Sequence, residues 1–111
     1  TFAKAKILAE RLGFKYASLG LESMGILREY SQIIIQTTSI GMGAEGESDE
    51  RNDPLWFYDF SGEEMLYDII YRPEITPIMA RAAKSGCKTQ NGYTMLKYQG
   101  EEQFRLFKSV L

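Results

Sequence analysis

The sequence predicts an α/β fold in which helices cover both faces of a mostly parallel sheet, and three observations support it. Segments of helical and strand-like pattern alternate along most of the 111 residues. The helical segments carry apolar residues at spacings of three and four. One strand-like segment, residues 31–36, contains three consecutive isoleucines, which is typical of a strand covered on both faces. Alternating helices and strands of this kind form three-layer folds with parallel strands.

The first element is predicted to be an amphipathic helix over residues 2–12. Apolar residues share one of its faces, and lysine, glutamate and arginine occupy other positions. Gly13 follows at the position where a left-handed residue commonly ends a helix. The apolar face consists of Ala3, Ile7, Leu8 and Leu12.

Weaker signals lead from this helix to the strongest strand. Residues 15–19 are a short strand candidate, and residues 21–30 are a second helix candidate that Gly25 weakens near its middle. Residues 31–36 then form the strand with three isoleucines, and small hydroxyl-bearing residues and glycines follow it. A long polar loop is expected from there to about Ser61.

The second half of the chain is predicted to hold two further strands and two further helices. The strands cover residues 65–71 and 87–90. Thr76 and Pro77 open a helix as hydroxyl cap and first-turn proline, and this helix ends at Gly86. Residues 93–111 form the last helix, in which apolar or small residues recur at spacings of four, four, three and four. These residues are Leu96, Gly100, Phe104, Phe107 and Leu111.

Small and polar residues follow all three predicted strands. Parallel strands bring their carboxyl ends to one edge of the sheet, and open α/β sheets bind ligands at that edge. Hydroxyls, an amide and glycine can satisfy a polar ligand and let the backbone approach it. Each residue taken singly also fits an ordinary turn, so it is the convergence of three loops that predicts a ligand site. The residues are Thr37, Thr38, Tyr71, Asn91 and Gly92.

Composition excludes several other classes of function. The chain is 44% hydrophobic, enough for one modest core and a single domain. Its net charge of −2 gives no reason to expect a nucleic acid or an anionic membrane as a partner. The sequence contains no histidine, which excludes Ser-His and Cys-His nucleophiles within it. Residues 45–53 are acidic but lack the register of a calcium loop, so no metal is expected.

The cysteine content and the apolar runs bear on the compartment. Cys87 is the single cysteine, which rules out a disulfide within the chain and fits a reducing environment. No apolar run reaches the roughly 18 residues that span a bilayer. Charges interrupt the first residues throughout, unlike a signal peptide. We therefore expect a cytoplasmic protein without a membrane span.

Four segments, in this order and spacing, resemble shikimate dehydrogenases. The stretches are TTSIGM, YDIIYRPEITP, Ala82-x-x-x-Gly86 and NGYTMLKYQ. The family typically carries an Asn-Thr-Thr-Pro-x-Gly-Met loop, a Tyr-Asp-x-x-Tyr-x-Pro-x-x-Thr-Pro segment and a last helix with Gly-x-x-Met-Leu-x-x-Gln. The first residues, TFAKAKILAERLG, are similar to the turn and helix after the family's second Rossmann strand. Two departures are Ser39 in place of proline and Gln36 in place of asparagine.

The resemblance implies that residues 1–111 are the C-terminal portion of an NADP-binding, partial Rossmann-like domain. The family's pyrophosphate-binding Gly-x-Gly-x-x-(Gly/Ala) turn, with the strand before it, has no counterpart here; the stretch GMGAEG, residues 41–46, has this spacing but lies in the polar loop after residues 31–36. Its separate substrate domain, with the lysine and aspartate that assist proton transfer, has no counterpart here either. We therefore expect a fragment or truncated product that contains no catalytic residue and does not turn over substrate by itself.

Binding roles can be carried over from the family position by position. Positions that contact the cofactor match Thr1, Lys4, Thr37, Thr38, Ser39, Ile69, Gly92 and Met95. Positions that contact shikimate match Tyr71 and Gln99. Simpler interpretations stay open: Tyr71 also fits an aromatic at the edge of the core, Gln99 a solvent-facing helix residue, and Lys4 an exposed helix lysine.

The resemblance also implies the activity of the parent protein. It would be an oxidoreductase that reduces 3-dehydroshikimate to shikimate with NADPH, in chorismate and aromatic amino acid biosynthesis. One alternative is a quinate/shikimate dehydrogenase with looser cofactor use, and another is a non-catalytic Rossmann-like binding module. An incomplete parallel sheet leaves an open edge, so a homo-oligomer that pairs through this edge is a further hypothesis.

Overall fold

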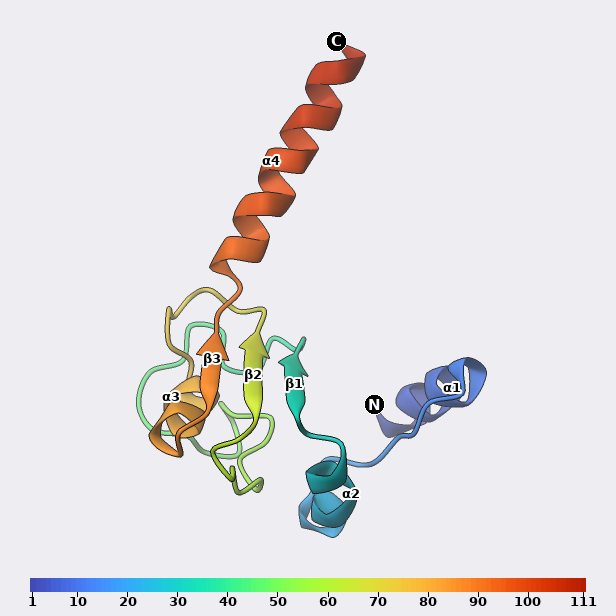
Figure 1. Ribbon diagram of the computed structural model, residues 1–111, viewed down its shortest axis with the longest axis vertical. Helices are drawn as coiled ribbons and strands as arrows, with labels where there is room; N and C mark the ends of the chain where they lie inside the picture. The colour runs from blue at the N-terminus through green and yellow to red at the C-terminus, as the bar shows by residue number, and fades with distance from the viewer.

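The sheet has three strands in the computed structural model, which describes residues 1–111. The strands are β1 (Ile33–Gln36), β2 (Met65–Asp68) and β3 (Lys88–Gln90), in the spatial order β1-β2-β3. Both neighbouring pairs are parallel, with Leu66 of β2 opposite both Ile34 and Thr89 (Figure 1). The predicted α/β class with a parallel sheet is therefore confirmed, and all three carboxyl ends lie at one edge.

Four α-helices accompany the sheet: α1 (Phe2–Leu12), α2 (Met24–Glu29), α3 (Pro77–Lys84) and α4 (Tyr93–Val110). Gly13 ends α1 with a left-handed φ of 74°, as predicted. The predicted helix over residues 21–30 begins as a 3₁₀ turn, Leu21–Ser23, and continues as α2. The strand predicted over residues 15–19 is wrong: these residues form a loop, because no strand lies beside them to pair with their backbone.

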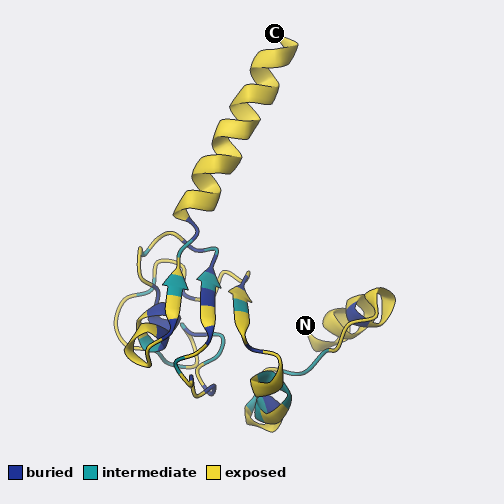
Figure 2. Cartoon of the chain, in the orientation of Figure 1, coloured by how far each residue is buried: buried dark blue, intermediate teal, exposed yellow.

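Helix α3 covers one face of β2 and β3 and supplies three of the eight residues of the core cluster, Ile78, Met79 and Ala82. It begins as predicted, with the Thr76 hydroxyl accepting from the Met79 amide at 3.4 Å and proline in the first turn. Its apolar side packs against Leu66, and both Leu66 and Ile78 are completely buried. Figure 2 shows buried stretches on α3 and on β2, with others on α1 and around α2, whereas α4 is exposed. The core cluster is Phe57, Tyr58, Phe60, Leu66, Ile78, Met79, Ala82 and Cys87.

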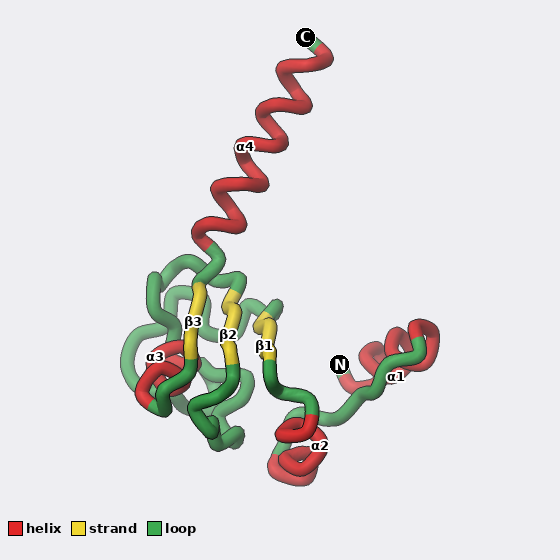
Figure 3. The backbone as a smooth tube through the Cα atoms, in the orientation of Figure 1, coloured by secondary structure: helices red, strands yellow, loops and turns green.

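The long segment between β1 and β2 contains only loops and turns (Figure 3), as the sequence predicts. Arg81 of α3 anchors it. The Arg81 guanidinium donates to the Asp53 carboxylate at 2.9 Å, to the Leu55 carbonyl at 2.7 Å and to the Tyr58 carbonyl. It also lies over the Phe60 ring, 4.7 Å from the centroid. These contacts hold the aromatic residues of the loop in the core.

The second helical layer that the sequence predicts does not form within this chain. Ile33 and Ile35 of β1 are 64% and 61% exposed, so β1 is not covered on both faces. The reason is that β1 is an edge strand and α3 is the helix that packs on the sheet, over β2 and β3. Three consecutive isoleucines indicated a strand, but they could not indicate what covers it.

Helices α1 and α4 pack against no strand of this sheet. In Figure 1 α1 lies to one side, and α4 rises away from the carboxyl ends of the strands. Their large apolar residues are exposed, including Leu8 on α1 and Phe104 and Phe107 on α4. The predicted helices are confirmed, but their apolar faces are uncovered. No helix is both long and apolar enough to cross a membrane.

Candidate functional site

A cleft of about 450 Å³ lies at the carboxyl ends of β1 and β2. One wall is the loop 37–43 that follows β1, and the other is the segment 69–72 that follows β2. The cleft therefore stands where the strand-end rule predicts a ligand site. Its lining residues are Thr37, Thr38, Ser39, Met42, Gly43, Ile69, Ile70, Tyr71 and Arg72.

Hydrogen bonds join the two walls to each other and join the loop after β3 to the segment after β2. The Gly43 amide donates to the Arg72 carbonyl at 2.9 Å, which ties the first wall to the second. The Gly92 amide donates to the Ile70 carbonyl at 3.0 Å. The Asn91 side chain donates to the Glu74 carbonyl at 2.9 Å. All three strand-end loops thus meet at one edge, as the sequence indicates.

Gly92 has a packing reason to be glycine. A Cβ atom at this position would lie 1.8 Å from the carbonyl oxygen of Ile69, so no side chain fits unless the backbone moves. The loop after β3 can therefore lie directly on the end of β2 only because residue 92 is glycine. This contact brings Gly92 next to Ile69, the other backbone position that the family resemblance assigns to the cofactor.

Gln36 organises the start of the first wall from inside the protein. Its side chain is 5% exposed, and its Nε2 donates to the Ile40 carbonyl at 3.1 Å and to Asp68 Oδ1 at 3.4 Å. Its Oε1 accepts the Thr38 amide. Thr38 and Ile40 are thereby held by one side chain at the end of β1.

Asp68 organises the second wall. Its Oδ1 accepts the Ile70 amide at 2.9 Å, and its Oδ2 accepts the Thr76 hydroxyl at 2.7 Å. Asp68 and Thr76 are both completely buried. Sequence reasoning did not single out Gln36 or Asp68 as site residues. One signal in the sequence pointed to Asp68: it is the single acid within the apolar stretch MLYDIIY. A carboxylate buried in such a stretch needs hydrogen-bond donors around it.

The structure brings some of the predicted site residues together and leaves others apart. Thr37, Thr38, Ser39, Ile69 and Tyr71 line the cleft, and Gly92 packs beside it. Two others, Met95 and Gln99, lie on α4, which starts at the same edge but is exposed along its length. The remaining two, Thr1 and Lys4, lie at the start of α1, away from the cleft (Figure 1).

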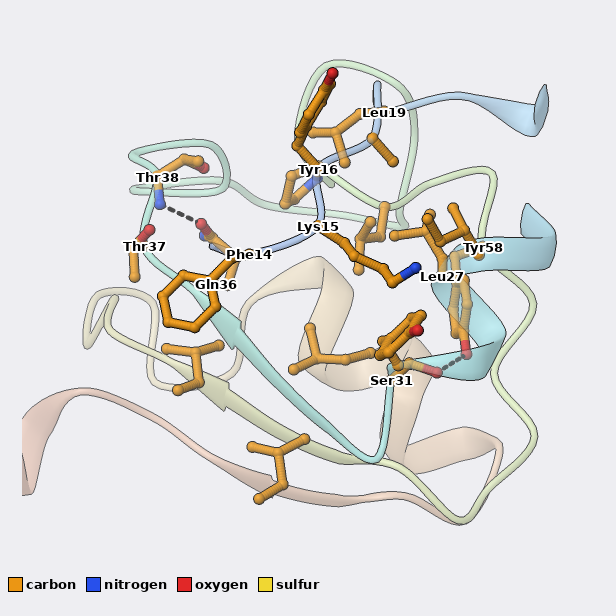
Figure 4. A pocket seen from close by; sticks show the side chains of 18 of the residues that line it. Phe14, Lys15, Tyr16, Leu19, Leu27, Ser31, Gln36, Thr37, Thr38 and Tyr58 are labelled. Atoms are coloured by element: carbon orange, nitrogen blue, oxygen red, sulfur yellow. Dashed lines mark hydrogen bonds between the residues drawn. The ribbon is translucent and has the colours of Figure 1, made fainter. Parts of the chain in front are cut away.

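A second, larger cavity of about 620 Å³ runs along β1 and is mainly apolar. Figure 4 shows Phe14, Tyr16 and Leu19 of the loop after α1 on one side and Leu27, Ser31 and Tyr58 on the other. A 2.6 Å hydrogen bond joins the Ser31 and Tyr58 hydroxyls. Thr37 and Thr38 line both cavities, so the two spaces adjoin at this loop.

Comparisons with known proteins agree with the motifs. No protein-family model matches the chain. The shikimate dehydrogenase (NADP(+)) of Thermococcus kodakarensis is 36% identical over 104 residues, which cover 94% of this chain and 36% of that protein. The enzyme of the same name from an Exiguobacterium species is 34% identical, over 99% of this chain and 38% of its own length. A crystal structure of a shikimate dehydrogenase in complex with NADP+ is 30% identical, with a TM-score of 0.66 over 96% of this chain and 37% of that one.

The fold and the cleft together define a Rossmann-like α/β chain with a ligand-sized space at the carboxyl edge of its sheet. Within that class, the chain is related to the NADP-dependent shikimate dehydrogenases over nearly its whole length, which confirms the resemblance seen in its motifs. It spans somewhat more than a third of the length of these relatives.

Proposed function

We propose that this chain is part of an NADP-dependent oxidoreductase that reduces 3-dehydroshikimate to shikimate, on the route to the aromatic amino acids. The observation that carries the proposal is the cleft at the carboxyl edge, because the segments that line it are those whose motifs resemble the family. The relatives add support, since their names state this activity and the similar crystal structure holds NADP+.

The side chains of the cleft suit an anionic cofactor and a hydroxylated acid. Thr37, Thr38 and Ser39 contribute hydroxyls, Arg72 contributes a positive charge, and no carboxylate lines the space. A guanidinium pairs readily with phosphate or carboxylate groups. NADPH, when bound, supplies the hydride that reduces the substrate carbonyl. The residues of this chain bind and orient the two reactants.

Within the cleft, roles follow from position. Loop residues 37–39 lie along the ribose and diphosphate side of the cofactor, and the backbone at Ile69 and Gly92 faces the nicotinamide end. Tyr71 points its phenol toward shikimate, which its 39% exposure at the cleft permits. A hydroxyl that can donate and accept suits a polyhydroxylated ligand.

Three further roles lie outside the cleft lining. Met95 packs near the nicotinamide, and Gln99 hydrogen-bonds a shikimate hydroxyl from the second turn of α4, about 9 Å along the helix from Tyr93. Both side chains are exposed and therefore free to make such contacts. Thr1 and Lys4 are assigned to the phosphate side of the cofactor on the motif resemblance alone.

We further propose that residues 1–111 are the C-terminal portion of the NADP-binding domain and are inactive by themselves. Hydride transfer needs a complete cofactor site and proton-handling groups. The complete gene product should oxidise shikimate with NADP+, measured by absorbance at the reduced nicotinamide band, and residues 1–111 alone should not. Turnover by residues 1–111 would contradict this part of the proposal.

The binding roles are tested by substitution in the complete gene product. Tyr71→Phe and Gln99→Ala should each raise KM for shikimate by about tenfold, because each removes a hydrogen bond to the ligand. The matched control is Tyr98→Phe, which removes the hydroxyl of an exposed neighbour on α4 and should leave KM unchanged. Equal KM values in the wild type and both site variants would refute the assignment.

Two broader features complete the proposal: a cytoplasmic location, and a homo-oligomer that pairs through the open edge of β1. The exposed Ile33 and Ile35 support the second, since an unpaired apolar edge favours pairing with another strand. Light scattering on residues 1–111 should report an oligomer that Ile35→Lys dissociates. The exposed position Ile7 on α1 offers a control, as Ile7→Lys should leave the mass unchanged.

A further inference from the structure

Asp68 is an unusual residue for the place it occupies. It is the last residue of β2 and is completely buried. A carboxylate in such a place is costly unless donors surround it. All three of its partners are neutral: the Gln36 amide, the Ile70 backbone N–H and the Thr76 hydroxyl. Asp68 forms no ion pair, so dipoles alone stabilise the buried group.

The three partners belong to three different segments around the cleft. Gln36 ends β1, Ile70 lies in the segment after β2, and Thr76 caps α3. The Asp68 carboxylate therefore holds three segments at fixed distances from one another: the end of β1, the second wall and the start of α3. No other side chain contacts all three segments through hydrogen bonds.

Gln36 connects Asp68 to the first wall. It holds the Thr38 amide through Oε1 and the Ile40 carbonyl through Nε2, while the same Nε2 reaches Asp68. The side chains of Thr37, Thr38 and Ser39 are exposed and give the loop no buried anchor of their own. Two backbone hydrogen bonds add to these ties: the Ile69 amide donates to the Gln36 carbonyl at 3.1 Å, and the Gly43 amide donates to the Arg72 carbonyl at the far end of the loop.

We propose that Asp68 and Gln36 are positioning residues that set the spacing of the two cleft walls, and thereby the fit of the cofactor loop to NADP. This inference rests on the proposed function. Neither residue lines the cleft, although Gln36 lines the adjoining larger cavity; both act through the backbone that they hold.

The test uses Gln36→Leu in the complete gene product, because leucine keeps most of the volume and removes both hydrogen-bonding ends. The Thr38 amide should exchange with solvent about tenfold faster, since it loses its acceptor. KM for NADP+ should rise by about tenfold with kcat within about twofold, as expected when a binding wall is displaced. Asp68→Asn is the second variant, and it should change KM in the same direction.

The matched control is Glu64→Gln, which alters the other buried carboxylate next to β2, at the opposite end of the strand. It should lower stability and leave both Thr38 exchange and KM for NADP+ at their wild-type values. Unchanged exchange and KM in Gln36→Leu, or an equal rise of KM in Glu64→Gln, would overturn the positioning role. If the wild-type gene product does not oxidise shikimate, the proposed function fails, and the exchange comparison of Gln36→Leu with Glu64→Gln still decides whether Gln36 holds the loop.

Discussion

The two ends of β2 each bury a carboxylate, and the two are held in different ways. Glu64, just before the strand, accepts hydrogen bonds from the Tyr58 hydroxyl at 2.9 Å, from the Ser61 and Gly62 amides at 3.0 Å, and from the Ser61 hydroxyl at 2.9 Å. Cys87 adds a thiol at 3.3 Å. Burial by itself would raise the pKa of the Glu64 carboxyl, but these donors outweigh it and lower the pKa to about 2.

Asp68, at the other end, takes its donors from segments that are far apart in the sequence. Gln36 lies 32 residues before it and Thr76 eight residues after it. Four of the five donors to Glu64 come from within six residues of it and close a local turn. The difference indicates that the amino end of β2 is built for stability, whereas the carboxyl end is built to hold separate loops at one place.

The largest expected effect comes from a substitution at the amino end of β2. Glu64→Gln should lower the free energy of unfolding by about 3 kcal/mol at pH 7, because a neutral amide leaves several of the donors without an acceptor. The folded pKa of Glu64 lies below its ordinary value of 4.5, so its stabilisation is present above pH 4.5 and lost as pH falls toward 2. Urea unfolding across pH 2–7 would measure both effects. A wild type and variant with parallel pH profiles would contradict this account of Glu64.

A smaller effect is expected at the carboxyl end. Gly92→Ala should destabilise the protein by about 2 kcal/mol, because the new methyl group meets the Ile69 carbonyl and pushes the loop after β3 off β2. Gly100→Ala on α4 is the matched control. Nothing lies within 4 Å of its added Cβ, so it should stabilise the helix by about 0.5–1 kcal/mol. Thermal unfolding of both variants distinguishes a tight contact from a general effect of replacing glycine.

The smallest expected effect concerns the Cys87 thiol beside Glu64 and needs no substitution. Burial raises the pKa of the Cys87 thiol, and the neighbouring Glu64 carboxylate raises it further. The folded protein should therefore react with a thiol reagent at pH 8 at least about tenfold more slowly than the urea-unfolded chain. Equal rates in the folded and unfolded protein would mean that the Glu64 site is open to solvent.

Local features of the sequence predicted local structure well. The Thr76-Pro77 start of α3, the Gly13 end of α1 and the strand at Ile33–Gln36 depend on propensity and capping, which neighbours in sequence determine. The wrong strand at residues 15–19 and the uncovered isoleucines of β1 have another cause. Whether a strand pairs or is covered depends on segments elsewhere in space, which no local pattern reports.

The candidate site divides in the same way. Hydroxyl and glycine residues at strand ends predicted the edge at which the cleft forms, because parallel strands fix that edge. The hydrogen bond between Gln36 and Asp68 joins residues 32 positions apart, and the clash that requires Gly92 involves the backbone of Ile69. Both depend on tertiary placement. The motif resemblance included these residues but did not show which contacts hold them in place.

The core cluster consists of residues that all fall between positions 57 and 87. A hydrophobic core that comes from one continuous stretch of the chain, somewhat less than a third of its length, does not depend on α1 or α4 for its packing. Peptide bonds in those two helices would therefore be cut first by a protease, and the trimmed remainder would keep its interior. During synthesis, the same stretch has all its packing partners as soon as Cys87 leaves the ribosome.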